Sequence, residues 1–294
     1  MERRAYYRGK TLPWLLIAPQ LLLVLVFFYW PTSQALYWAF TLEQAWGGGN
    51  SWVWFDNFML LFMDARYWGT VLRSGFYAVV ATGLSMAGAL TLALFVDRSL
   101  KGTKLFQSIY IWPYAIAAPA AGVAFRFMFS PQAGLIGFVN KLWPGIWDPS
   151  TVGWQALIMV IVCHAWLGIG YNFVFFLAAL QMIPRSITEA GAMDGARPMQ
   201  RMVDLQLPLI APTTFFLIIM NLISSFTDSF GLIDVMTEGG PIGATDVMVY
   251  KIYVDGFKGL DYSGAAAQSI VLMILVIALT FVQFKWVERR IHYS

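Results

Sequence analysis

Charged residues are scarce in this chain of 294 residues, in which only 12% are Asp, Glu, Lys or Arg. A typical soluble domain has about 25%. Hydrophobic residues make up 59%, so the chain lacks the polar surface that would enclose soluble cores, which excludes a soluble enzyme and a disordered chain. The net charge of +3 is too small to indicate nucleic-acid binding. An integral membrane protein remains.

Cysteine and histidine are almost absent. The single cysteine, Cys163, excludes a disulfide scaffold. The two histidines, His164 and His292, lie in no cluster with carboxylates at metal-ligand spacing, so we predict neither a metal site nor catalytic residues. The chain also lacks the Gly-x-x-x-x-Gly-Lys-Ser/Thr phosphate-binding loop. We therefore expect that this chain binds no cofactor of its own.

Long hydrophobic runs dominate the sequence. A spanning helix needs about 20 largely apolar residues, and six windows of sufficient length contain no charged residue. We predict spanning helices over residues 12–40, 72–96, 105–129, 153–180, 207–229 and 263–285. The predicted fold is an all-α integral membrane protein in which residues 1–294 form a single transmembrane domain. The uncharged run 127–140 is too short to span and predicts an interfacial segment.

Basic residues are unevenly distributed between the two sides of these spans. About two thirds of the Lys and Arg residues flank the side that holds both termini and the loop 181–208, and cytoplasmic loops carry such an excess. We therefore expect both termini and this loop in the cytoplasm.

The loop 181–208 contains a predicted short helix. Ser186 followed by Glu189 matches a capping box, and Gly195 is a favoured helix terminator. These residues predict a helix over residues 187–194. Asp194 at its end would oppose the helix dipole, a cost that pairing with Arg197 or Arg201 would offset.

Small residues predict a docking role for this helix. Ala190, Gly191 and Ala192 remove side-chain bulk, so another surface can approach closely. A helix resting on the membrane surface is the alternative that spacing alone leaves open.

The same residues carry a family resemblance. Glu189-Ala190-Gly191, Asp194-Gly195-Ala196 and Leu205-Gln206-Leu207-Pro208 resemble the EAA loop of ABC-importer permeases, with Gly191, Met202 and Leu205 in place of the commoner Ala, Phe and Ile. Segments 17–31, 166–184 and 237–241 are similar to the carbohydrate-uptake branch, and segment 250–273 to permeases of sn-glycerol-3-phosphate importers.

The resemblance implies a type I ABC importer permease fold in a bacterial inner membrane, forming half of a translocation pathway. It implies a second homologous permease subunit, two ATPase subunits that bind ATP and Mg²⁺, an extracytoplasmic solute-binding protein and surrounding lipid as partners, and no nucleic acid. The residues that it assigns to contact with the ATPase are Glu189, Ala190, Gly191, Asp194 and Gly195.

Polar residues within the spans are candidates for the substrate pathway, because polar groups in a bilayer usually face a cavity or another helix. Asn221, Ser224, Ser225 and Asp228 share one face of the fifth span. His164, Gly168, Tyr171 and Asn172 form a similar stripe on the fourth. The predicted pathway residues are Tyr171, Asn172, Asn221, Ser225, Asp228 and Gln268.

Other roles remain open for these residues. Helix–helix hydrogen bonding is the favoured explanation for Ser224 and Ser225. For Asn172 and Asn221 it explains the residues as well as a role in the pathway does. Arg126 is a possible phosphate partner, although an arginine near the end of a span commonly extends to the interface instead.

The resemblance favours sn-glycerol-3-phosphate as the substrate, with a di- or oligosaccharide as the alternative. An ion-coupled secondary transporter is a distant third, because such a transporter would need carboxylates in mid-span and the six windows contain none.

Overall fold

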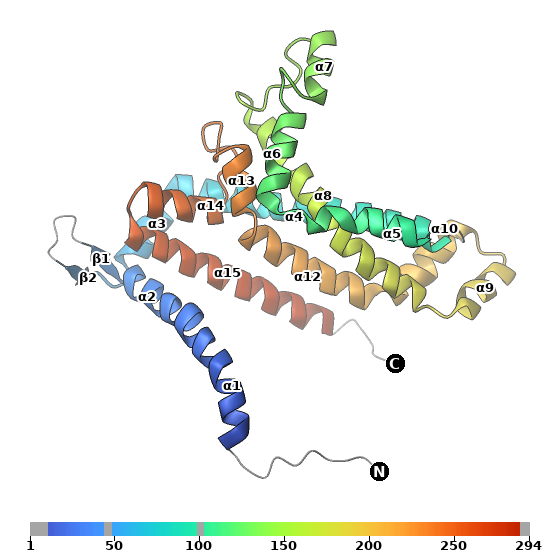
Figure 1. Ribbon diagram of the computed structural model, residues 1–294, viewed down its shortest axis with the longest axis horizontal. Helices are drawn as coiled ribbons and strands as arrows, with labels where there is room; N and C mark the ends of the chain where they lie inside the picture. The colour runs from blue at the N-terminus through green and yellow to red at the C-terminus, as the bar shows by residue number, and fades with distance from the viewer. Residues whose placement is uncertain (1–10, 44–48, 99–102, 289–294) are drawn as a thin grey trace. The chain divides into compact units, whose positions relative to one another are not determined.

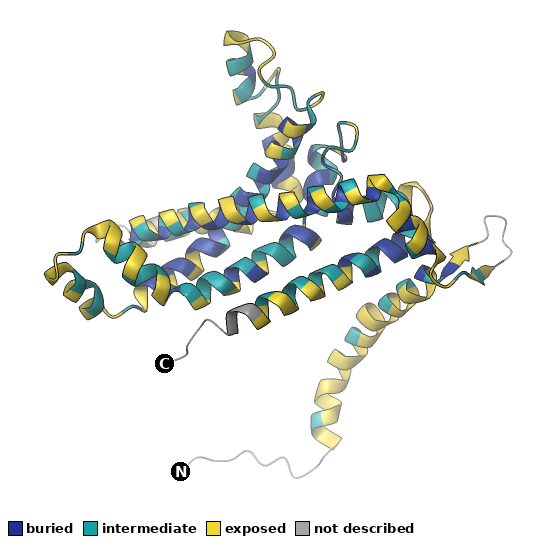
Figure 2. Ribbon diagram, turned by 180° about the vertical axis from the view of Figure 1, so that it is seen from behind, coloured by how far each residue is buried: buried dark blue, intermediate teal, exposed yellow. Residues whose placement is uncertain are grey.

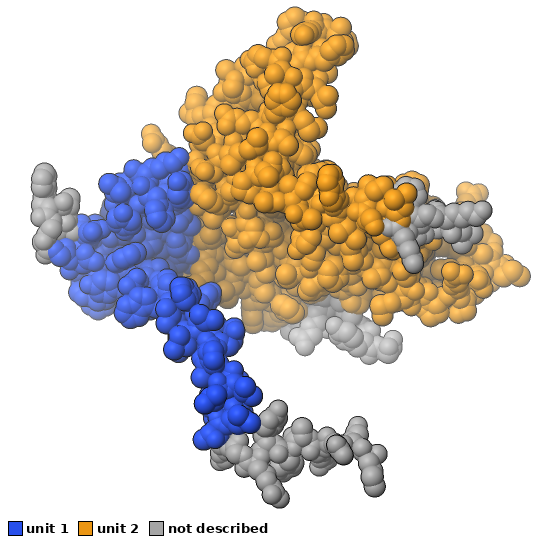
Figure 3. Space-filling model, in the orientation of Figure 1, with its two compact units in different colours: residues 1–64, 252–271 blue, residues 65–251, 272–294 orange. Residues whose placement is uncertain are grey.

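The computed structural model describes residues 11–43, 49–98 and 103–288, and most of them are helical. They fall into two compact units, residues 1–64 with 252–271 and residues 65–251 with 272–294 (Figure 3). Several basic residues on which the orientation depends lie outside the described residues, namely Arg3, Arg4, Arg8, Lys10, Lys101, Arg289 and Arg290.

The first unit begins with one long apolar helix. It comprises α1 (Thr11–Val24), the π-helical turn Leu25–Tyr29 and α2 (Trp30–Ala39). No residue of α1 is buried, and Figure 2 shows both helices almost wholly exposed. Such an apolar surface requires lipid or protein cover.

A short hairpin in this unit was not predicted, although the chain is mostly helical, as an all-α fold requires. β1 (Thr41–Glu43) pairs antiparallel with β2 (Asn50–Trp52). The following helix, α3 (Asp56–Met63), is fixed by Asn57, whose Nδ2 donates to the carbonyl oxygens of Ala39 and Thr41 at 2.9 and 3.0 Å. Strands of three residues are too short for a reliable alternation pattern in the sequence.

The end of α14 and the start of α15 complete the first unit. α14 (Met248–Tyr253) continues as the π-helical turn Val254–Lys258, and α15 runs over Tyr262–Glu288. Ala266, Ala267 and Ile270 of α15 pack against Ala39 in a small core.

The second unit is a helical bundle (Figure 1). Its three long helices, which pack against one another, are α4 (Ala65–Arg98), α8 (Gly153–Gln181) and α12 (Ala211–Thr227). Ala89 and Ala93 of α4 are fully buried in one core cluster with Phe173 and Phe176 of α8. Small side chains let the helix backbones approach closely, as in other membrane bundles.

The predicted span 105–129 is broken. α5 (Thr103–Ile111) leads into a 3₁₀ turn (Trp112–Ala115), and α6 (Ala118–Met128) continues after a bend of 100°. Pro113 and Pro119 lie on either side of the break, and each lacks the N–H that a continuous helix requires. The helix α7 (Leu135–Leu142) begins in the run 127–140 that was predicted to be interfacial and ends two residues beyond it.

The predicted fifth span, 207–229, is also bent. The elements before α12 are α9 (Arg185–Met193), α10 (Pro198–Arg201), the π-helical turn Met202–Gln206 and α11 (Leu207–Leu209). The chain turns by 69° at Ile210, so the straight helix begins at Ala211. After α12, the short helix α13 (Phe230–Met236) completes the unit.

Four helices in the described residues are long and apolar enough to cross a membrane, and the number rises to six if each bent pair forms one span. The four are Thr11–Ala39, Ala65–Asp97, Gly153–Gln181 and Tyr262–Lys285.

Candidate functional site

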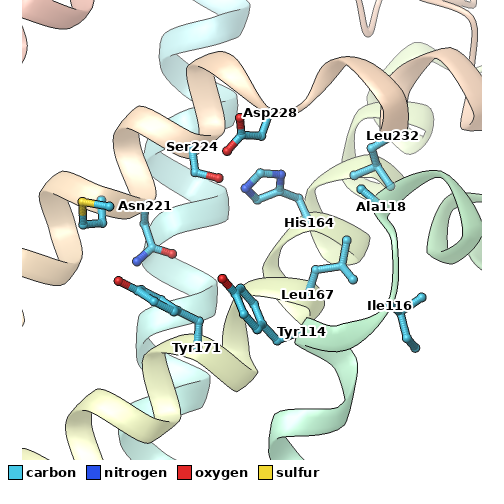
Figure 4. A pocket seen from close by; sticks show the side chains of 12 residues that line it. Tyr114, Ile116, Ala118, His164, Leu167, Tyr171, Asn221, Ser224, Asp228 and Leu232 are labelled. Carbon is cyan, nitrogen blue, oxygen red and sulfur yellow. The ribbon is translucent and has the colours of Figure 1, made fainter. Parts of the chain in front are cut away.

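A cavity of about 330 Å³ lies within the second unit, between α8, α12 and the broken span (Figure 4). Its wall is polar on the α12 side and aromatic or aliphatic on the side of the broken span. It is lined by Tyr114, Ile116, Ala118, His164, Leu167, Gly168, Tyr171, Met220, Asn221, Ser224, Asp228 and Leu232.

The two polar stripes identified in the sequence meet in this cavity. His164 and Tyr171 approach from α8, while Asn221 and Ser224 approach from α12, with Asp228 just beyond its end (Figure 4). Three of the six predicted pathway residues, Tyr171, Asn221 and Asp228, therefore line one space. Their contact with substrate stays a prediction.

Asn172 lies behind the wall rather than in it. Its side chain is fully buried, and Nδ2 donates to Ser85 Oγ at 2.8 Å and to Asn221 Oδ1 at 2.9 Å. Asn221 Nδ2 donates back to Asn172 Oδ1 at 2.7 Å. The two amides therefore form a reciprocal pair that joins α8 to α12. This geometry gives Asn172 the helix-packing role that the sequence left open.

Two other predicted pathway residues do not line the cavity either. Ser225 is buried, with its hydroxyl 3.4 Å from His164 Nε2. Gln268 belongs to the first unit, where its Nε2 donates to Asp255 Oδ2 at 2.6 Å. Its Oε1 is buried without a hydrogen-bond partner in the described part of the chain.

The charge of the cavity lining comes from one side chain. Asp228 contributes a carboxyl group, and neither Lys nor Arg is among the lining residues of the described chain. His164 has both ring nitrogens engaged, Nδ1 with the Tyr77 hydroxyl at 2.8 Å and Nε2 with Ser225. The lining therefore combines one carboxylate acceptor with neutral hydroxyl groups that can donate or accept.

The broken span supplies Tyr114, a lining residue that the sequence analysis did not predict and that packs beside the predicted Tyr171. The rings of Tyr114 and Tyr171 have centroids 5.5 Å apart and planes inclined by 32°. Tyr114 reaches this position because the chain stops being helical after Ala115. Pro113 and Pro119 were the residues from which the break in this span could have been predicted.

Arg126 lies in a different place. Its Nη1 donates to the carbonyl oxygen of Val235 at 2.9 Å, and it lines a second cavity of about 350 Å³ with Glu238. It is absent from the lining of the first cavity. Near this second cavity, hydrogen bonds from Ser150 and Thr151 lower the pKa of the Asp148 carboxyl below its usual value.

The predicted loop helix is present as α9, with a different beginning. It starts at Arg185, after Pro184 in the N-cap position, and no side chain caps it. The capping box of Ser186 and Glu189 was therefore wrong. With Pro184 as the N-cap (φ −58°, ψ 129°), the helix starts at Arg185, two residues before the start that Ser186 as N-cap would give.

Gly195 ends this helix as predicted. Its φ is +80°, and its N–H donates to the Ala192 carbonyl at 3.1 Å while the Ala196 N–H donates to the Gly191 carbonyl at 3.0 Å. This pair of bonds is a Schellman motif. At Gly191, a Cβ atom would lie 2.8 Å from Leu205 Cδ1, so two of the three departures from the family pattern pack against each other.

The predicted ion pair of Asp194 with Arg197 or Arg201, which would offset its unfavourable position at the helix end, was wrong. Its carboxylate forms no ion pair with Arg197 or Arg201 in the described structure, and Arg201 Nη1 donates to the Thr188 carbonyl at 3.3 Å instead. Glu189, Ala190, Asp194 and Gly195 are exposed, and no residue of α9 is buried. Four of the five predicted coupling residues thus present an accessible surface, and their role stays a prediction.

No group of three or more His, Cys, Asp or Glu residues within the described ranges is placed to hold a metal ion.

Long apolar helices around a cavity with both polar and apolar walls are typical of a multi-pass membrane transport protein. The chain belongs to the family of binding-protein-dependent transport system inner membrane components, whose model matches residues 3–293. It is therefore a permease component of a multi-subunit ABC importer of the inner membrane.

The similar curated proteins share a name. The chain is 43% identical over 292 residues to the sn-glycerol-3-phosphate transport system permease protein UgpA of Rhizobium meliloti, covering 99% of this chain and 100% of that protein. The UgpA proteins of Brucella suis, at 43% over 292 residues, and Salmonella typhi, at 42% over 291 residues, are similar to the same extent. Each alignment covers 99% of this chain.

Solved structures share the fold. A bacterial ABC transporter involved in the import of the acidic polysaccharide alginate matches with a TM-score of 0.82, 22% identity and 96% coverage of both chains. The same kind of transporter in complex with an alginate-bound periplasmic protein matches with a TM-score of 0.81 and 22% identity, over 95% of this chain and 94% of that one.

Proposed function

We propose that this chain forms half of the translocation pathway of an ATP-driven importer of sn-glycerol-3-phosphate. The observation that carries the proposal is the 43% identity, over nearly the full length of both chains, to permeases named for that substrate. Identity at this level and coverage supports a shared substrate class more strongly than a shared fold does, because unrelated functions recur on one fold.

The proposed assembly supplies what this chain lacks. Two ATPase subunits would bind ATP and Mg²⁺, a second homologous permease would form the other half of the pathway, and an extracytoplasmic solute-binding protein would deliver substrate. This chain itself would bind no cofactor. The exposure of Glu189, Ala190 and Asp194 on α9 supports its docking to an ATPase.

The proposed topology has six spans, with each bent pair counted as one, and residues 1–294 as a single transmembrane domain with both termini in the cytoplasm. The distribution of basic residues supports this orientation. It places the loop 181–208 on the side where ATP is available.

A neutral di- or oligosaccharide is the second candidate substrate. It is favoured by the cavity lining, in which a pair of tyrosine rings and several hydrogen-bond acceptors occur without Lys or Arg. Sugars and polyols present hydroxyl groups and apolar C–H faces that suit such a lining.

Uptake into proteoliposomes tests the proposal. The complete complex, with its solute-binding protein and internal ATP, is supplied with labelled glycerol-3-phosphate, maltose or trehalose. We expect accumulation of glycerol-3-phosphate that requires both ATP and the solute-binding protein. Preferential accumulation of maltose or trehalose would support the second candidate, and uptake without the ATPase subunits would contradict both.

A further inference from the structure

We propose that the cavity of this chain binds the uncharged, hydroxyl-bearing end of the substrate through Asp228, and that this carboxylate keeps the anionic group of the substrate out. The inference rests on the proposed function, because the anionic group in question is the phosphate of glycerol-3-phosphate. It assigns a specificity role to one residue and divides the substrate into an end that this cavity binds and an end that it rejects.

The charge of the lining is the first argument. A phosphate group is bound most strongly by cationic donors such as Arg and Lys, and the described lining has neither. Arg126, the arginine that the sequence suggested, donates to the Val235 carbonyl and lines the other cavity. A phosphate beside Asp228 would meet a like charge without compensation, which is how binding sites reject wrong ligands.

His164 does not supply the donor that a phosphate would need in this cavity. His164 directs both ring nitrogens at hydroxyl groups, those of Tyr77 on α4 and Ser225 on α12. These bonds use the two polar positions of the ring. His164 therefore contributes to the shape of the cavity and has no free N–H with which to bind a phosphate oxygen.

The acceptors of the lining are the second argument. The only hydrogen bond that the Asp228 side chain makes within the described residues comes from Thr227 Oγ1 to Oδ1, at 3.0 Å. Its second oxygen is left to accept from a ligand, and a hydroxyl group is the donor that a polyol offers. Asn221 offers less, since its Nδ2 donates to Asn172 and Leu217 and its Oδ1, which lies near Gly168 of the lining, already accepts one hydrogen bond from Asn172 Nδ2.

The aromatic wall is the third argument. The Tyr114 and Tyr171 rings lie across the cavity from Asp228 (Figure 4). A small polyol placed between them would direct its hydroxyl groups to the acceptors and its C–H groups to the rings. An ionised phosphate gains nothing from the apolar ring faces, and the two tyrosine hydroxyl groups are neutral donors that do not compensate its charge.

A double-mutant cycle tests the inference, in which substitution of Asp228 is combined with removal of single hydroxyl groups from the substrate. Uptake by the complete complex is measured for wild type and Asp228→Asn with three labelled substrates: glycerol-3-phosphate, propane-1,2-diol 1-phosphate and propane-1,3-diol monophosphate. Each analogue lacks one hydroxyl group and keeps the phosphate. Because the solute-binding protein is the same in both complexes, its selectivity cancels in the ratio of wild-type to variant rate for each substrate.

We expect Asp228→Asn to slow uptake of glycerol-3-phosphate about tenfold or more, the loss expected for a hydrogen bond to a charged group. The analogue that lacks the contacted hydroxyl should be slowed less than about twofold. A matched control is Asp234→Asn, because Asp234 is on α13, contacts the Tyr250 hydroxyl at 3.4 Å and lies outside the cavity lining. That variant should leave all three ratios near one.

Two results would overturn the inference. Equal slowing of all three substrates would mean that Asp228 acts on the structure or the transport cycle rather than on a hydroxyl group. Faster uptake of all three phosphates by Asp228→Asn would place the phosphate, and not the hydroxyl end, beside this residue.

The proposed function can fail separately. If the wild-type complex does not take up glycerol-3-phosphate, that function is wrong, and the cycle is repeated with maltose and a set of its monodeoxy derivatives. A selective effect of Asp228→Asn on maltose relative to one derivative would still support a hydroxyl subsite at Asp228, while a uniform effect would exclude it.

Discussion

At the scale of single residues, the most informative side chain is Asn172. The sequence left two roles open for it, pathway contact or helix packing. Full burial and three hydrogen bonds to Ser85 and Asn221 favour the second. Gly168, one turn earlier, permits this approach, because a Cβ there would lie 2.6 Å from Ser85 Oγ.

Replacing Asn172 with Ala should destabilise the bundle by about 1–3 kcal/mol, because the Asn221 amide and the Ser85 hydroxyl would lose their partner. The measurement is the thermal unfolding midpoint of the detergent-solubilised complex. Thr91→Val is the matched control, since Thr91 is exposed on α4 and bonds only to its own helix at Ala87. An unchanged midpoint for Asn172→Ala would show that the reciprocal pair contributes little.

Gly195 gives a second prediction at this scale. A non-glycine residue at a φ of +80° costs about 1–2 kcal/mol, and a Cβ there meets no other atom within 4 Å. We expect Gly195→Asn to keep most uptake, because Asn tolerates this conformation. Gly195→Trp should abolish ATP-dependent uptake at a normal level of membrane insertion, because the bulk blocks docking. Undiminished uptake by the Trp variant would refute the coupling role.

At the scale of elements, the broken span and α8 depend on each other. Gly170 of α8 lies against the turn at the break, where an added Cβ would be 2.8 Å from the Tyr110 carbonyl oxygen and 3.2 Å from that of Ile111. Backbone atoms cannot turn aside as a side chain can. The close approach of these two elements holds Tyr114 at the cavity.

Gly170→Ala should therefore destabilise the second unit by about 1–3 kcal/mol, the usual cost of overpacking, and should widen the cavity. Gly75→Ala on α4 is the control, because no atom lies within 4 Å of its added Cβ and alanine is the better helix former. The thermal unfolding midpoint of Gly170→Ala should therefore be lower than that of Gly75→Ala. Equal midpoints would mean that the broken span is not fixed against α8.

At the scale of the whole molecule, the proposed topology can be tested through the cysteine content. Cys163 is the only cysteine of the sequence and is fully buried, so an introduced cysteine reports alone. Met193, the last residue of α9, and Ile242, in the loop after α13, are both highly exposed. The proposed topology places them on opposite sides of the membrane.

We expect a membrane-impermeant maleimide to label Ile242→Cys in intact cells and Met193→Cys only after permeabilisation. Labelling of wild type under both conditions gives the background from Cys163. The reverse pattern would invert the orientation. Labelling of both variants in intact cells would place both residues outside, so the proposed span between them would not cross the membrane and the count of six spans would be wrong.

Hydropathy predicted the long helices of this molecule, whereas features that depend on local backbone conformation were not predicted. The number and approximate position of the apolar helices followed from hydropathy, because a helix that crosses lipid must be apolar along about 20 residues. The break at residues 116–117, the π-helical turns and the hairpin did not, since they depend on local backbone conformation. The capping box failed because a proline in extended conformation replaced Ser186 as the helix start.

The sequence by itself determined the class of protein, the family and the loop that carries the proposed coupling residues, because composition, hydropathy and motif spacing are properties of the chain alone. Only the tertiary structure decided which polar residues share a space. Asn172 and Asn221 both belong to polar stripes in the sequence, yet one is enclosed by hydrogen bonds and the other lines the cavity. That difference arises from how α4, α8 and α12 pack, and packing is set by contacts between residues far apart in the chain.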